Sequence, residues 1–271
     1  MAVQTGPERA SASPTTGATA PGTPARPGMG DSLRRLGSVQ KSTVGVPAYM
    51  RWVNRPVGGL LAVVSHRLGL TPTQVTGVSA LLSFGGILAL ATLRPSALTA
   101  VLVGLALALG FAFDSADGQL ARLRGGGTLA GEWLDHVVDA VKSSSLHAAV
   151  AISLYRFTDL DHPAVLLLPL AYGVVGLTQY FGMMLRDQLL RTRKVPAPAG
   201  TPRPAPEQGS LLKAVLLLPV DYGVLCLVFF LLAWTTAFLW AYGALLVLTA
   251  AFAVHSLSKA YRSLVRASAS S

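Results

Sequence analysis

Long apolar stretches separated by short polar connections dominate the chain after its first quarter. Six such stretches lie near residues 72–93, 97–118, 133–155, 163–184, 211–232 and 236–257. At a rise of 1.5 Å per residue, each stretch is long enough as a helix to cross the ~30 Å hydrocarbon core of a bilayer. The pattern therefore predicts an all-α integral membrane protein with six transmembrane helices.

The segment before the first span has a different pattern. Residues 44–67 mix large apolar side chains such as Trp52 and Leu60 with arginines such as Arg51 and Arg55. A helix of this composition lies in the headgroup layer, with its apolar face toward the acyl chains. We therefore expect an interfacial amphipathic helix ahead of the six spans.

The start of the chain has almost no large apolar side chains. Residues 1–43 are rich in Pro, Gly, Ala, Ser and Thr, so they cannot bury enough surface to offset chain entropy. The expected organisation is a disordered cytoplasmic tail over residues 1–43, the interfacial helix over 44–67, and a six-helix membrane catalytic domain over 68–271. That domain includes a Pro-rich, basic cytoplasmic loop at 191–213.

Composition and charge agree with a membrane protein. Only 13% of the residues are charged and 52% are hydrophobic, whereas soluble domains carry about 25% charged residues. Of the 22 Lys and Arg, Arg94 and Arg156 fall in outer connections, Lys142 falls within a span, and the others lie on the side of the N-terminus. Cytoplasmic segments collect such residues, so both termini are expected in the cytoplasm. The net charge of +10 is then explained by orientation and anionic lipid, with no nucleic acid partner.

Four aspartates gather on the inner halves of the second and third spans. Asp114, Asp117, Asp135 and Asp139 account for a third of the 12 acidic residues in the chain. An aspartate at mid-membrane costs about 2.5–3.5 kcal/mol, and two like charges ~4 Å apart repel by roughly 4 kcal/mol at an effective dielectric of 20. Cations must offset these costs. Ligation by oxygen alone selects hard ions, so we expect Mg²⁺ or Mn²⁺.

The spacing of these aspartates predicts how they are held. Asp135 and Asp139 are four residues apart and share one helix face, while Asp114 and Asp117 are three apart on the neighbouring helix. A tight turn through the glycines at 125–127 should fold the second helix back beside the first. The two pairs can then face each other.

Three neighbouring residues extend the chemistry of this cluster. Gly118 and Gly131 remove side chains beside the acidic rows, so a flat or bulky ligand can approach the backbone. Arg122, one turn beyond Gly118, offers a fork suited to phosphate oxygens. The residues thus predict a site for a diphosphate-containing substrate, with two ions stabilising an in-line displacement at phosphorus.

A family resemblance rests on these same positions. The segment reads Asp114-Ser-Ala-Asp117-Gly118-Gln-Leu-Ala121-Arg122, followed at fixed spacing by Gly131, Asp135 and Asp139. It resembles in every position the signature of the CDP-alcohol phosphotransferases, also called CDP-alcohol phosphatidyltransferases. The resemblance extends to the six-span layout and to Thr71-Pro72-Thr73 at the start of the first span.

The resemblance implies a function that spacing alone does not give. A phosphoalcohol group, a phosphatidyl group in many members, would pass from a CDP-alcohol such as CDP-diacylglycerol to an acceptor alcohol, with release of CMP, in phospholipid biosynthesis. It also implies an active site at the cytoplasmic face of a bacterial plasma membrane, and a homodimer.

Roles for individual residues follow from the resemblance. The implied metal ligands are Asp114, Asp117, Asp135 and Asp139, and Asp139 would also take the acceptor proton. The implied contacts to the CDP-alcohol are Thr73, Asp114, Asp117, Gly118, Ala121, Arg122 and Gly131. The cytidine would lie near the glycines, Ala121 and Thr73, and the diphosphate near Arg122 and the ions.

The acceptor side is less determined. Lys142, Arg186 and Asp221 are candidates to contact the acceptor, each with a structural alternative: an ion pair for Lys142, headgroup contact for Arg186 and a polar contact at the Pro219 kink for Asp221. Ala140 follows Asp139 where many relatives carry Arg or Lys, and the fifth span lacks the arginine-rich entrance of members that bind phosphorylated alcohols. These positions give a phosphorylated acceptor no support.

Two other functions compete with this interpretation. A divalent-cation transporter could use the same acids as a permeation site, but it would not require Gly118, Ala121, Arg122 and Gly131. An inactive scaffold is disfavoured because no position of the motif is substituted.

Overall fold

The computed structural model describes residues 42–159, 162–192 and 209–269, together with Gly30, Arg34, Leu36 and Gly37. Nearly all of the tail predicted over residues 1–43, and residues 193–208 of the predicted loop, lie outside the described residues. The disorder expected for the tail and the flexibility expected for the loop therefore stay predictions.

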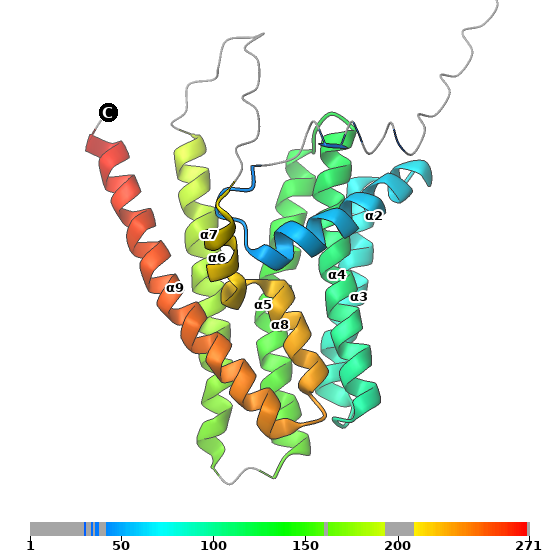
Figure 1. Ribbon diagram of the computed structural model, residues 1–271, viewed down its shortest axis with the longest axis vertical. Helices are drawn as coiled ribbons and strands as arrows, with labels where there is room; N and C mark the ends of the chain where they lie inside the picture. Colours follow the sequence, from blue (N-terminus) through cyan, green and yellow to red (C-terminus); the bar gives the residue numbers. More distant parts are fainter. Residues whose placement is uncertain are drawn as a thin grey trace, which may run out of the picture.

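Helices make up the described part of the chain, which contains no strand (Figure 1). The interfacial segment forms a π-helical turn, η1 (Met50–Asn54), that runs into α2 (Arg55–Arg67). Five helices are long and apolar enough to span a membrane. They are α3 (Pro72–Thr92), α4 (Ala97–Leu123), α5 (Leu129–Phe157), α6 (Leu167–Arg191) with the short η2 (Pro163–Leu166) before it, and α9 (Thr235–Ala269).

The expected fifth span, 211–232, is not one helix. It is divided into α7 (Leu211–Leu216), η3 (Leu218–Val220), α8 (Tyr222–Val228) and η4 (Phe229–Leu231). Pro219 lies in η3, where its ring and missing N–H oppose a continuous α-helix. The pieces follow one another from the level of α2 to the turn before α9 (Figure 1). The all-helical membrane fold is confirmed, and the count of six spanning helices is not.

Hydroxyl side chains fix where three of the long helices begin. Thr71 accepts from the backbone N–H of Gln74, whose side chain accepts in return from Thr71, and this capping box starts α3. The Ser96 and Thr128 hydroxyls cap α4 and α5 by accepting a hydrogen bond from a backbone N–H of the first turn. By contrast, α6 follows Leu166, which makes no side-chain cap.

The backbones of α4 and α5 do not pack closely against each other, although polar side chains from the two helices meet. The turn between them uses Gly125 (φ 93°) and Gly126 (φ 141°), which are backbone conformations that favour glycine. α3 packs against both helices, α5 also packs against α6, and α6 packs against α9. Within the described residues α4 and α5 form no substantial interface with each other. The second helix does fold back, as expected, but its main neighbours are α3 and α6.

The interfacial segment is fastened to α4. The amide of Gln119 donates to the backbone oxygen of Arg55 (2.9 Å), and the amide of Asn54 donates to the backbone oxygen of Phe111 (3.2 Å). A Cβ on Gly58 would come within 2.8 Å of the Ser115 side chain, so this glycine permits the close crossing. Specific contacts therefore hold this segment against α4, and its place in the headgroup layer stays a prediction.

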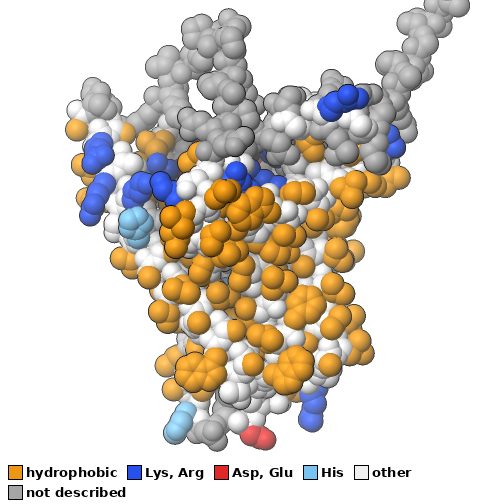
Figure 2. All heavy atoms as spheres, viewed as in Figure 1, with side chains coloured by type: hydrophobic (Ala, Val, Ile, Leu, Met, Phe, Trp, Pro, Cys, Tyr) orange, Lys and Arg blue, Asp and Glu red, His pale blue; other side chains and the backbone are white. Residues whose placement is uncertain are grey.

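The surface divides into an apolar band and a basic end. Figure 2 shows hydrophobic side chains around the middle of this face, with most of its Lys and Arg at the end where α9 terminates. The same end carries α2 and the start of α5 (Figure 1). This matches the charge asymmetry predicted from the sequence.

Candidate active site

Three of the four motif aspartates come together between α4 and α5. Asp114, Asp135 and Asp139 each offer a carboxylate oxygen, and these oxygens lie within 4.8 Å of one another. All three residues are partly buried. Carboxylate oxygens at this separation fit a hard divalent cation such as Mg²⁺ or Mn²⁺, and the donor set suits no soft metal.

Asp117 faces the same region through a different contact. It is 5% exposed, and its carboxylate accepts a 2.6 Å hydrogen bond from the Thr76 hydroxyl on α3. Asp135 and Asp114 lie close enough to act on it electrostatically. Sequence reasoning missed Thr76, although Thr76 follows Thr73 by three residues and so shares its helix face.

Lys142 lies within the acidic cluster. Its ammonium is 2.6 Å from Asp139 and 2.9 Å from Asp114, and the residue is 5% exposed. The ring of Tyr222 on α8 stands 5.8 Å from the ammonium. Of the two alternatives for Lys142, the structure provides the ion pair that neutralises buried charge.

The residues expected around the nucleotide also meet in pairs. A Cβ on Gly118 would lie 3.5 Å from a guanidinium nitrogen of Arg122, so the arginine extends back over the glycine. A Cβ on Gly131 would lie 3.9 Å from the Thr73 hydroxyl, which joins α5 to the start of α3. Ala121 lies nearby, 3.6 Å from where a Cβ on Gly127 would stand.

Asp221 and Arg186 are held by contacts outside the acidic cluster. The Asp221 carboxylate accepts from the backbone N–H of Met50 (2.9 Å) and of Gly223 (2.9 Å), which caps α8. Arg186 donates to the Ser263 hydroxyl (3.1 Å) and pairs with Asp187 (2.7 Å), so it joins α6 to α9. For Asp221 this is the structural alternative, a polar contact beside the break at Pro219.

His136 and Tyr180 tie α5 to α6 next to the acids. The Tyr180 hydroxyl lies 3.1 Å from His136 Nδ1 and donates to the His136 backbone oxygen at 3.0 Å. His136 follows Asp135 directly, so this contact fixes the helix beside a motif aspartate. His136 points about 100° away from Asp135 around the helix, which predicts packing or a supporting contact for it. Tyr180 carries no signal in the sequence, because its partner is 44 residues away.

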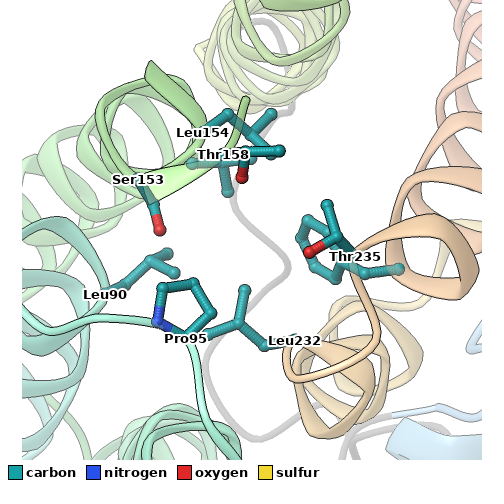
Figure 3. Close-up of a pocket in the computed structure, with 9 residues that line it drawn as sticks. Leu90, Pro95, Ser153, Leu154, Thr158, Leu232 and Thr235 are labelled. Carbon is teal, nitrogen blue, oxygen red and sulfur yellow. The ribbon is translucent and has the colours of Figure 1, made fainter. Parts of the chain in front are cut away.

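A cavity at the opposite end of the bundle is unrelated to this chemistry. Figure 3 shows Leu90, Pro95, Ser153, Leu154, Thr158, Leu232 and Thr235 around it. Ser153 lies about 21 Å beyond Asp139 along α5 at 1.5 Å per residue. We therefore place the candidate active site at the aspartates, where the charged groups converge.

Comparison with known proteins identifies the family. Residues 70–255 match the family described as CDP-alcohol phosphatidyltransferase. The chain belongs to this family. The match includes α3 to α8 and most of α9, so the complete candidate site lies within it. This confirms the resemblance read from the motif.

Individual relatives agree with the family assignment. Phosphatidylinositol phosphate synthase of Corynebacterium glutamicum is 40% identical over 90 residues, which is 33% of this chain and 39% of that protein's length. Two crystal structures of Mycobacterium tuberculosis phosphatidylinositol phosphate synthase are similar in fold at 20% identity. The structure with manganese and citrate has a TM-score of 0.52 and covers 77% of this chain and 89% of its own. The structure with CDP-DAG bound has a TM-score of 0.51, and the match covers 77% of this chain and 94% of that one.

Proposed function

We propose that this CDP-alcohol phosphatidyltransferase family member moves a phosphatidyl group from CDP-diacylglycerol to an acceptor alcohol and releases CMP, as a step of phospholipid biosynthesis. The observation that carries the proposal is the cluster of three carboxylates from α4 and α5, whose oxygens lie within 4.8 Å of one another. Gly118 and the Arg122 side chain that extends over it lie on the same helix as Asp114. The CDP-DAG bound in one solved structure of similar fold supports the choice of donor.

Each motif residue has a task in this reaction. Asp114, Asp117, Asp135 and Asp139 would hold two divalent ions, Mg²⁺ or Mn²⁺, and bound ions would neutralise the carboxylates and withdraw charge from the diphosphate. Arg122 binds diphosphate oxygens through its planar fork. Gly118 and Gly131 leave room for the cytidine, with Ala121 and the Thr73 hydroxyl beside it.

Asp139 acts as the base. It accepts the proton of the acceptor hydroxyl while the hydroxyl oxygen attacks the β-phosphorus. A new P–O bond forms, the bond from the β-phosphorus to the bridging oxygen breaks, and the electron pair leaves with CMP. Proton transfer to a positioned side chain contributes typically 10²–10⁴-fold to a rate.

The setting of the reaction completes the proposal. The basic end of the molecule faces the cytoplasm of a bacterial plasma membrane, which places the aspartates near that side, and the chain forms a homodimer. The charge asymmetry supports the orientation. Arg186, on the same side, is the candidate contact for the acceptor.

A CMP-release assay tests the proposal. Purified protein receives CDP-diacylglycerol, Mn²⁺ or Mg²⁺, and a panel of alcohols that includes glycerol phosphate, inositol and inositol phosphate. We expect CMP with at least one acceptor and at least a hundredfold loss in Asp139→Asn. Asp159→Asn, an exposed acid in an outer connection, is the matched control and should behave as wild type.

Two results would contradict the proposal. One is undiminished CMP release by Asp139→Asn. The other is no CMP with any acceptor, and uptake of divalent ions by proteoliposomes would then favour the transporter.

A further inference from the structure

Lys142 joins the two helices that carry the aspartates. It lies on α5, three residues after Asp139, and reaches Asp114 on α4. In both contacts the partner is the same atom type: Oδ1 of Asp139 at 2.6 Å and Oδ1 of Asp114 at 2.9 Å. A lysine ammonium has three N–H donors and no acceptor, so two donors are committed to carboxylates of different helices.

The surroundings of Lys142 leave it little freedom to turn elsewhere. The residue is 5% exposed, and the Tyr222 ring stands 5.8 Å from its ammonium, within the range of a cation–π contact. Phe111 packs edge-on against Tyr222, with ring centroids 5.0 Å apart. Lys142 is thus a fixed positive charge at the edge of the acidic cluster.

This arrangement divides the oxygens of two carboxylates. Asp114 and Asp139 each give Oδ1 to Lys142, so the second oxygen of each carboxylate is not committed to this lysine. A permanent +1 charge also offsets the repulsion between carboxylates that belong to helices without a substantial interface of their own. The aspartates can therefore stand together before any ion arrives, although the same charge weakens the attraction for that ion.

We propose that Lys142 is a positioning residue that reserves Oδ1 of Asp114 and Asp139, so that their Oδ2 atoms are held for the divalent ion and for the acceptor proton. The inference rests on the proposed function of this site. It assigns Lys142 to pre-organisation of the carboxylates, not to contact with the acceptor. An equivalent interaction is not required by the family motif, whose positions end at Asp139.

The test compares Lys142→Met with Lys142→Arg and with the control Lys259→Met, which removes an equal charge from an exposed position on α9. Binding of Mn²⁺ alone is measured by electron paramagnetic resonance and by the Mn²⁺-induced shift in Tm. Turnover and KM are measured separately with the CMP assay.

We expect Lys142→Met to bind Mn²⁺ about tenfold more tightly, because a nearby like charge is gone. Its kcat should fall by about a hundredfold with KM for the CDP-alcohol unchanged, because Asp139 has lost its orientation. Lys142→Arg keeps the charge and should retain the Mn²⁺ affinity of wild type to within about threefold. Lys259→Met should match wild type in every measurement.

Three results would overturn the inference. They are a Mn²⁺ affinity in Lys142→Met equal to or weaker than wild type, an unchanged kcat in that variant, and a Mn²⁺ affinity in Lys142→Arg raised as in Lys142→Met. A merely structural lysine would lower Tm without moving Mn²⁺ affinity. If wild type releases no CMP with any acceptor, the proposed function fails, yet the Mn²⁺ measurements still decide the role of Lys142. If Lys142→Met does not fold, Lys142→Arg alone decides it.

Discussion

Replacing Asp221 with alanine separates the two roles that the sequence left open for this residue. In the structure the Asp221 carboxylate accepts a 2.9 Å hydrogen bond from the backbone N–H of Met50 and another of 2.9 Å from that of Gly223. The residue is 3% exposed. Asp221→Ala removes both acceptors and leaves both N–H groups without that partner. The substitution should therefore weaken the attachment of the interfacial segment to α8.

The magnitude follows from the two contacts. Loss of a helix N-cap costs about 0.5–2 kcal/mol. Leaving a buried N–H without a partner costs about 1–3 kcal/mol. Together they predict a loss of roughly 1.5–5 kcal/mol, and in a protein of this size about 2–4 °C of Tm accompanies each kcal/mol. Tm should fall by roughly 3–20 °C.

The assay is thermal unfolding in detergent, with acceptor KM measured on the fraction that remains folded. Asp221→Asn keeps one side-chain oxygen and should fall between wild type and Asp221→Ala. The control is Asp159→Ala, which removes an exposed acid. An unchanged Tm with an acceptor KM raised tenfold in Asp221→Ala would refute this reasoning and place Asp221 in the acceptor pocket.

Three further predictions concern the nucleotide and metal side of the site. Gly118→Ala should leave Tm unchanged, because its Cβ would meet Arg122 at an ordinary 3.5 Å, while KM for the CDP-alcohol rises at least about tenfold in the CMP assay if cytidine needs that space. Thr76→Val should lower Tm by several degrees and turnover by about tenfold, because the Asp117 carboxylate loses its 2.6 Å hydrogen bond, and recovery with Thr76→Ser would be the expected rescue. Removal of divalent ions with EDTA should abolish CMP release, and excess Mn²⁺ or Mg²⁺ should restore it; activity that survives EDTA would contradict a metal role.

The motif could be found from the sequence because its residues lie close together along the chain. Asp114 to Arg122 occupy consecutive turns of one helix, and Asp135 and Asp139 lie four apart on the next. Helix periodicity and the cost of burying carboxylates suffice to predict that such residues gather around cations.

The contacts that support the motif could not be found in the same way. Thr76 reaches Asp117 across 41 positions of sequence, and Tyr180 reaches His136 across 44. Both pairs exist because α3 packs on α4 and α6 packs on α5. To predict these pairs one must know which helices pack together and at what angle they cross, and hydropathy does not encode this.

The broken fifth span shows a second limit of hydropathy. The apolar residues from 211 to 232 are numerous enough to cross a bilayer, but hydropathy counts side chains and ignores the backbone. Pro219 and Asp221 carry the local signal: the first interrupts the helix, and the second caps the piece that follows. The kink could be anticipated, but the division into four short pieces could not.

The bond between Met50 and Asp221 has a consequence for how the enzyme senses its lipid surroundings. It joins the segment before α2, which the sequence predicts to be interfacial, to the residue before Tyr222, whose ring stands beside Lys142. With the segment in the headgroup layer, as the sequence predicts, we expect a change in bilayer thickness to be passed through this hydrogen bond to Tyr222 and the acidic cluster. The rate measured in vesicles should then change with acyl-chain length even when substrate and ion concentrations are saturating.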